Sequence, residues 1–124
     1  MTWEIIETDL AEQDRDKAVL FVLGLRQADY ATRWHRGLTA AIAALKDFPG
    51  PRAFPRVESE EEVRRQETRV MLYRGPDKRP ADSVTYRVLF TLFDPIQGEE
   101  VGAIFIQRIR HAQRGDAQEQ DFNA

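Results

Sequence analysis

Two stretches decide the fold, Tyr86-Arg87-Val88-Leu89-Phe90 and Ile104-Phe105-Ile106-Gln107-Arg108-Ile109-Arg110-His111. Both are short and rich in β-branched and aromatic residues, and the turn residues Asp94-Pro95 and Gly98 lie between them. This is the pattern of two antiparallel strands joined by a hairpin connection. The second stretch also ends in two arginines and a histidine, so we expect the functional residues at that end of the sheet.

The spacing of apolar residues changes from helical to strand-like near residue 50, which predicts helices followed by strands. The expected elements are a strand at Trp3–Glu7, helices at Leu10–Arg26 and Tyr30–Leu45, and strands at Glu67–Arg74, Ser83–Phe93 and Glu100–Arg110. Asp9 is the expected cap of the first helix, and Pro49-Gly50-Pro51 ends the second. The order predicts an α+β fold with an N-terminal strand, a helical hairpin and a three-stranded antiparallel meander. We expect the strands to form a small antiparallel sheet with the helical hairpin on one face.

The amphipathic pattern also predicts the core, because the apolar face of a helix packs on a sheet. The expected core residues are Trp34, Leu38, Ile42 and Leu45 against Val88, Phe90, Ile104 and Ile106. A chain of 124 residues is long enough for one such core. We therefore expect a single domain over residues 1–115, followed by a polar, disordered tail at residues 116–124.

Composition excludes several classes of protein. The chain has no cysteine and two histidines far apart, so disulfides, thiolate metal sites and a zinc motif are not expected. Its longest mostly apolar run, Ala18–Leu25, is much shorter than a membrane span, and the N-terminus lacks a signal-sequence pattern. We expect a cytoplasmic protein that needs no metal or cofactor and does not bind a membrane.

The net charge of -3 is unevenly distributed. Residues 1–62 and 116–124 are acidic, whereas residues 63–115 contain more basic than acidic side chains. A basic sheet region in an acidic protein is compatible with a local anionic target, such as RNA, a nucleotide or an acidic peptide. The alternative is a set of solvated strand-edge arginines without a ligand.

Four segments in this order resemble the RelE/ParE superfamily of toxins from type II toxin–antitoxin modules. They are the helix Ala31–Leu45 running into a proline loop, the strand end Arg69–Gly75, and the segments Tyr86–Phe90 and Arg108–His111. The resemblance covers about residues 3–114 and implies the RelE/ParE-like fold described above.

The superfamily contains two kinds of toxin. Members similar to RelE cut messenger RNA on the ribosome without a metal, which requires a general acid/base and cations around the phosphate. By this resemblance His111 is the candidate acid/base, because its unperturbed pKa is near neutrality. Arg69, Arg87, Arg108 and Arg110 are the candidate phosphate clamp, with Tyr86 or Tyr73 as a secondary acid or a stacking platform.

The alternation of side chains along a strand tests this set of residues. It places Arg108 and Arg110 on one face with Gly102, Ile104 and Ile106, and His111 beyond the strand end. It also directs Tyr86 and Arg87 to opposite faces. We therefore group Arg87 with Arg108 and Arg110 and interpret Tyr86 as a core residue. His111 is either the acid/base or a strand-end histidine that bonds a loop carbonyl.

Members similar to ParE act instead by binding a protein, DNA gyrase, and a cognate antitoxin neutralises them. The acidic net charge and the single sheet lysine, Lys78, favour this ParE-like interpretation. The alternatives are the metal-independent endoribonuclease and a non-toxic member that retains only antitoxin binding. In all three cases the expected partner is an antitoxin, and the domain alone is expected to form a homodimer or to be poorly soluble.

Overall fold

The computed structural model describes residues 2–57, 67–76 and 84–112. Its elements are β1 (Thr2–Glu7), α1 (Asp9–Leu25), α2 (Ala28–Ala43), the 3-10 turns η1 (Ala44–Lys46) and η2 (Pro51–Ala53), β2 (Glu67–Tyr73), β3 (Tyr86–Phe93) and β4 (Val101–His111). The expected tail at residues 116–124 and Ser83, the expected start of a strand, lie outside the described residues. In the described part of the chain, no helix is long and apolar enough to cross a membrane.

The four strands form one mixed sheet in the order β1-β4-β3-β2. Strands β2, β3 and β4 pair antiparallel, whereas β1 pairs parallel to β4, with Ile5 beside Ile104. The expectation of a wholly antiparallel sheet is therefore wrong for β1. Parallel neighbours need a long crossover, and here the helices and the other strands lie between β1 and β4 in the sequence.

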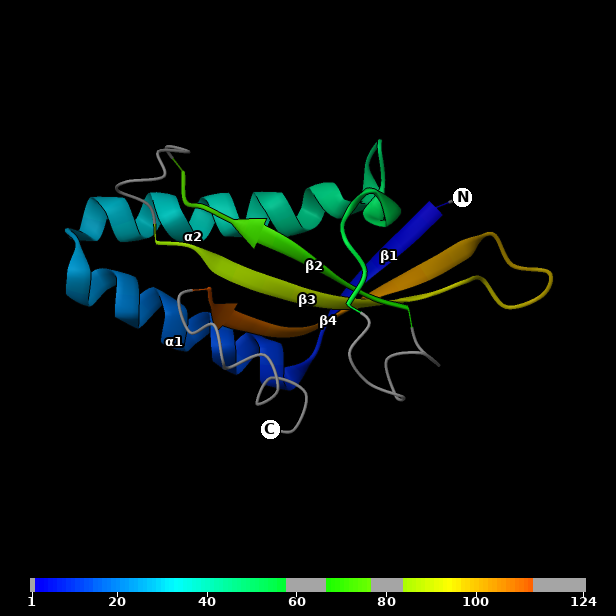
Figure 1. The fold of residues 1–124 in the computed structure, drawn as a ribbon, viewed down its shortest axis with the longest axis horizontal. Coiled ribbons are helices and arrows are strands. Elements are labelled where there is room, and N and C mark those ends of the chain that lie inside the picture. Colours follow the sequence, from blue (N-terminus) through cyan, green and yellow to red (C-terminus); the bar gives the residue numbers. More distant parts are fainter. Residues whose placement is uncertain (1, 58–66, 77–83, 113–124) are drawn as a thin grey trace.

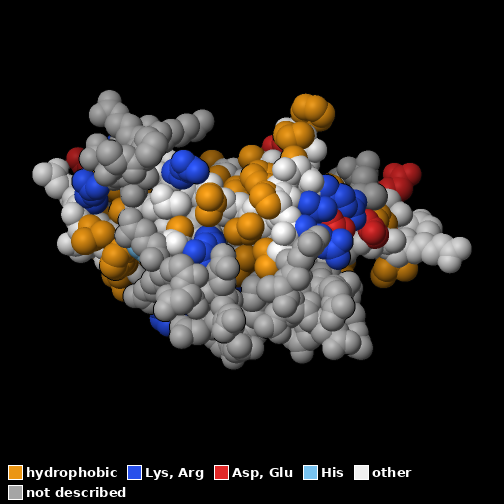
Figure 2. Space-filling view, viewed as in Figure 1, with side chains coloured by type: hydrophobic (Ala, Val, Ile, Leu, Met, Phe, Trp, Pro, Cys, Tyr) orange, Lys and Arg blue, Asp and Glu red, His pale blue; other side chains and the backbone are white. Residues whose placement is uncertain are grey.

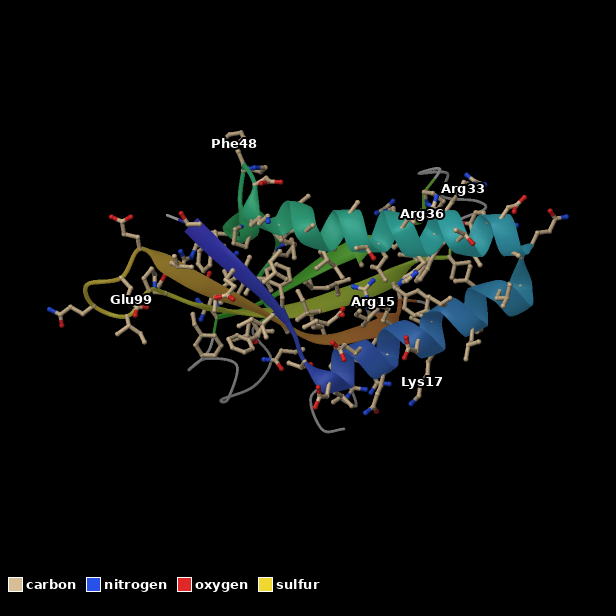
Figure 3. The ribbon with its side chains drawn as sticks, turned by 180° about the vertical axis from the view of Figure 1, so that it is seen from behind. Arg15, Lys17, Arg33, Arg36, Phe48 and Glu99 are labelled. Atoms are coloured by element: carbon tan, nitrogen blue, oxygen red, sulfur yellow. The ribbon has the colours of Figure 1, made fainter. Side chains whose placement is uncertain are left out.

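Both helices lie side by side on one face of the sheet (Figures 1 and 3). Arg26 and Gln27, which are not helical, separate the two helices. The sequence predicted the separation close to this position, between Arg26 and Tyr30. Thr8, not Asp9, caps α1: its hydroxyl accepts a hydrogen bond from the Ala11 amide at 3.2 Å and donates to the Ile106 carbonyl at 2.9 Å. The cap thus also joins the start of α1 to β4.

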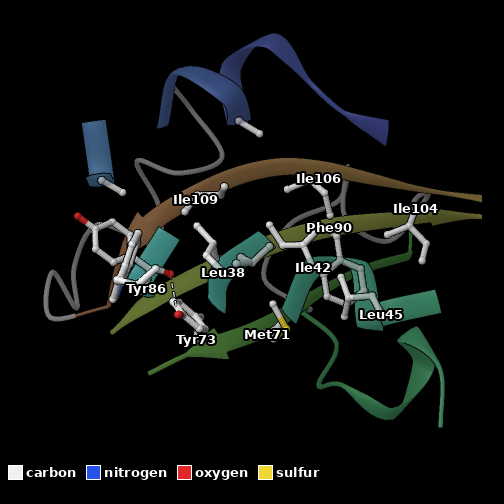
Figure 4. Close-up of a cluster of buried hydrophobic side chains, with 14 of the residues drawn as sticks. Leu38, Ile42, Leu45, Met71, Tyr73, Tyr86, Phe90, Ile104, Ile106 and Ile109 are labelled. Atoms are coloured by element: carbon white, nitrogen blue, oxygen red, sulfur yellow. Dashed lines mark hydrogen bonds between the residues drawn. The ribbon is translucent and has the colours of Figure 1, made fainter. Parts of the chain in front are cut away.

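The core between helices and sheet contains all eight residues expected from the sequence. Trp34, Leu38 and Phe90 are wholly buried (Figure 4 shows the cluster from Leu38 to Ile109). The Trp34 indole donates a hydrogen bond to the Val84 carbonyl at 3.0 Å. The backbone carbonyl of Trp34 accepts a hydrogen bond from the Tyr73 hydroxyl at 2.7 Å. Tyr73 is therefore a structural residue that ties β2 to α2.

An irregularity in β4 sets the direction of the residues at its end. Phe90 of β3 pairs with Ile106, whereas the preceding Leu89 pairs with Arg108, so Gln107 is an extra residue in β4. Such a bulge interrupts the alternation of faces. As a result Ile109, and not Arg108, continues the row of core side chains that contains Ile104 and Ile106. The expectation that Arg108 and Arg110 share a face with Ile106 is wrong for this reason.

Candidate functional site

The end of the sheet where β3 begins and β4 ends carries most of the candidate residues. Arg87 lies directly opposite Arg110, and Tyr86 lies directly opposite His111. Tyr86 is buried and packs edge-to-face on Trp34, with ring centroids 5.2 Å apart, as expected for a core tyrosine. His111 is the last residue of β4 and not beyond it, because its pairing with Tyr86 extends the strand by one residue.

His111 lies between two aromatic rings. Its ring centroid is 5.2 Å from that of Phe21 on α1 and 5.2 Å from that of Tyr86, both in edge-to-face geometry. These contacts hold the imidazole beside the helix, at a pocket that Arg110 also lines. Arg87 donates to the carbonyl of Ala112 at 2.8 Å and does not line this pocket.

Arg108 is committed to a buried ion pair. Its Nε lies 2.8 Å from Oδ2 of Asp14, and the same oxygen accepts the amide of Ile109 at 3.0 Å. Strand β1 ends at Glu7 opposite Ile106, so beyond that point the edge of β4 has lost its neighbouring strand. The carboxylate of Asp14 takes the place of the missing strand and binds both the backbone and the arginine.

Asp14 is the residue of this region that the sequence analysis missed. It lies on the buried stripe of α1 together with Ala11, Ala18 and Val22. A carboxylate on an otherwise apolar helix stripe is a usable signal, because a buried charge requires a partner. The spacing of 94 residues to Arg108 hides that partner from any local pattern.

Arg69 belongs to a different cluster, formed with the segment that precedes the sheet. Its Nε donates to Glu67 at 2.7 Å, and its terminal nitrogen donates to the Phe54 carbonyl at 2.6 Å. Arg52 bridges the same Glu67 and Asp94, at 3.0 and 2.8 Å. Arg69 pairs with Phe90, well along β3 from Arg87, so it is not part of one clamp with Arg87 and Arg110.

Charge pairing changes the acidity of this second cluster. Burial alone would raise the pKa of Glu67, but the hydrogen bonds from Arg52 and then Arg69 outweigh it, so the pKa lies below its ordinary value. Hydrogen bonds to Glu67 and Asp94 raise the pKa of Arg52. These groups therefore stay ionised and paired at neutral pH, which indicates a structural role.

Comparison with protein-family models, with curated proteins and with solved structures found no match to this chain. Of the five candidate residues, Arg110 and His111 line one pocket, Arg87 faces Arg110, Arg108 pairs with Asp14, and Arg69 lies in the other cluster.

Proposed function

We propose that this protein is the toxin component of a type II toxin–antitoxin module and that it acts in the ParE manner, by binding proteins. The proposal starts from the sequence resemblance and is supported by the order of elements around the mixed sheet. It is also supported by the separation of the arginines. A metal-independent nuclease needs its cations around one phosphate, and Arg69 and Arg108 are each committed elsewhere.

The observation that carries the proposal is the apolar outer surface of α1. The sheet-facing side of this helix is buried, yet on the other side Leu20 is 68% and Leu23 45% exposed. A helix on the surface of a monomer normally presents polar residues to water, and neighbouring exposed leucines indicate a protein contact. We assign this surface, formed by Leu20 and Leu23, which lie three positions apart on α1, to an antitoxin or a target protein.

The face of the sheet that the helices leave uncovered offers a second apolar surface. Apolar side chains gather across its centre (Figure 2). Among them, Leu72 of β2 and Phe93 of β3 are about half exposed, because they point away from the side that Met71 and Phe90 bury. This surface is the second candidate contact for the target or the antitoxin.

A growth assay tests the proposal. Induced expression of the protein should arrest growth, and co-expression of the small protein encoded beside it should relieve the arrest. The double variant Leu20→Glu/Leu23→Glu should lose arrest or antitoxin binding, because two charges oppose an apolar contact. The matched control is Thr32→Glu/Ala40→Glu, at two exposed positions of α2, which should behave as the wild type. Equal activity of both double variants, with folding intact, contradicts the assignment.

The second candidate function is the metal-independent endoribonuclease, which the shared pocket of His111 and Arg110 favours. If it is correct, His111→Ala should lower RNA cleavage by about 10²-fold or more, the usual size of a general acid/base contribution. Arrest that persists in the double variant His111→Ala/Arg110→Ala, together with inhibited gyrase supercoiling, excludes the nuclease. A stable antitoxin complex without any arrest would instead identify the non-toxic member.

The state of the isolated protein is a separate expectation. Because its leucines would contact water when no partner is present, the protein alone should form a homodimer. Light scattering should show a dimer that the partner converts into a hetero-complex. A monomer whose mass does not change when the neighbouring gene product is added would contradict this expectation.

A further inference from the structure

The two edges of the sheet differ in what covers them. In the order β1-β4-β3-β2 the edge strands are β1 and β2. The segment before the sheet covers the outer side of β2, where the Val57 amide donates to the Thr68 carbonyl at 2.9 Å and the Val70 amide donates to the Pro55 carbonyl at 3.0 Å. Among the described residues, no backbone pairs with the outer side of β1. Strand β1 therefore presents an open edge to which another strand can pair.

The register of β1 shows which of its residues face the open side. The amides of Thr2 and Thr8 both donate to carbonyls of β4, at 3.3 and 3.2 Å. Backbone groups along a strand alternate between its two neighbours, so the even-numbered residues of β1 bond to β4. The odd-numbered residues direct their N–H and C=O groups to the open side. These residues are Trp3, Ile5 and Glu7.

A groove of about 620 Å³ runs along this open edge. Side chains from both faces of β1 line it, among them Glu4 and Ile5, so the groove lies beside the strand and not over one face of the sheet. Its other wall is one side of α2 and η1, because the lining residues there recur at helical spacing. They are Thr39, Ile42, Ala43 and Lys46. In Figure 3, β1 runs from the end of α2 to the start of α1.

On the helix side of the groove, the two ends carry opposite charges. Glu7 lies at the end next to α1, where Arg15 binds it and also donates to the Thr39 hydroxyl at 2.7 Å. Oε2 of Glu7 accepts only the longer bond from Arg15, at 3.3 Å, so it can accept a second cation. Lys46 is exposed and lies two helical turns beyond Thr39, in η1, which contacts β1 at the other end.

We infer that β1 is an interface with a second copy of this chain, whose β1 pairs antiparallel to it about a two-fold axis at Ile5. This register pairs Trp3 of each copy with Glu7 of the other and uses every outward-facing amide of the strand. A register centred on Glu4 would instead place two like charges opposite each other. The register at Ile5 avoids this and brings Lys46 of one copy to the Glu7 end of the other.

The dimer joins two four-stranded sheets into one continuous sheet with both pairs of helices on the same face. It goes beyond the proposed function, because it needs no toxic activity and no antitoxin. It also names a surface for the homodimer that is expected of the isolated protein. That surface is separate from Leu20 and Leu23, which lie in the second half of α1.

Single cysteines test the register, because the chain has none of its own. Opposite residues of a hydrogen-bonded antiparallel pair have Cα atoms about 5.5 Å apart, which a disulfide can bridge. Ile5→Cys should therefore form a covalent dimer on mild oxidation, although Ile5 is half-buried. The control is Glu4→Cys, which is exposed. Its two copies would lie roughly 8 Å apart on a diagonal and should cross-link at least about tenfold more slowly.

Two charge variants test the interface without a cysteine. Residue 6 lies opposite Glu4 of the other copy, and this pair occurs twice in the dimer. Ile6→Glu and Ile6→Lys remove the same apolar side chain, but only the glutamate repels Glu4. Sedimentation equilibrium should give a dimer Kd about tenfold higher or more for Ile6→Glu than for Ile6→Lys. The double variant Glu4→Lys/Ile6→Glu, which restores opposite charges, should dimerise like Ile6→Lys. Circular dichroism establishes that each variant is folded.

The results also separate this interface from the leucines of α1. Ile5→Cys should cross-link equally well in the Leu20→Glu/Leu23→Glu background. Loss of the cross-link there would place the homodimer on α1 and overturn the β1 interface. The inference is likewise overturned if the protein is monomeric, if Glu4→Cys cross-links as fast as Ile5→Cys, or if the two Ile6 variants have the same Kd. Protection of the β1 amides from hydrogen exchange only after a different protein is added would assign the edge to that protein instead.

Discussion

Removal of the carboxylate of Asp14 should destabilise the protein more than a typical substitution. Asp14→Ala deletes three hydrogen bonds, from Arg108 Nε at 2.8 Å, Arg108 Nη2 at 3.3 Å and the Ile109 amide at 3.0 Å. Both partners are buried, at 6 and 7% exposure, so the variant leaves a guanidinium and an amide without compensation. Loss of one member of a buried ion pair costs about 3–5 kcal/mol. We expect a decrease of that size in the free energy of unfolding.

Urea unfolding followed by tryptophan fluorescence measures this decrease, because Trp34 lies in the core. The control is Asp16→Ala, an exposed acid on the same helix, which should change the free energy by less than about 0.5 kcal/mol. The double variant Asp14→Leu/Arg108→Met removes both charges and should be more stable than Asp14→Ala. A loss below about 1 kcal/mol in Asp14→Ala would refute the assigned role of the ion pair.

Two further predictions concern packing and pH. Gly102→Ala should lower the free energy of unfolding by about 1–3 kcal/mol, because the added Cβ would lie 2.7 Å from the Trp3 ring and 2.9 Å from the Phe93 carbonyl oxygen. The control is Gly24→Ala in α1, where the added Cβ meets nothing within 4 Å; it should be neutral or stabilising in the same urea titration. Glu67→Gln should cost about 0.5–1 kcal/mol at pH 7, since half-exposed Arg52 limits the gain. Because folding lowers the pKa of Glu67 from 4.5, the difference in stability between the variant and the wild type should decrease as the pH falls below 4.5 and vanish below the lowered pKa of folded Glu67. A difference that stays constant through this acid range would contradict the prediction.

The sequence alone determined the local elements and the core. Helical spacing from Tyr30 to Leu45 and the apolar runs of β3 and β4 predict structure because each depends on residues close in the chain. For the same reason the burial of Trp34 and Tyr86 could be predicted. The predicted cap of α1, Asp9, was one residue too late in the sequence. Thr8 and Asp9 are both good capping residues, and the choice between them depends on the hydrogen bond from the Thr8 hydroxyl to the Ile106 carbonyl.

The tertiary structure decided the arrangement of the candidate site. The parallel pairing of β1 with β4 and the Asp14–Arg108 ion pair join residues about 100 positions apart, which no local periodicity records. The extra residue Gln107 reversed the alternation in β4, so counting from Gly102 gave the wrong face for Arg108. Side-chain chemistry can be read from a sequence, but whether a charge is available to a ligand depends on which distant residue it contacts.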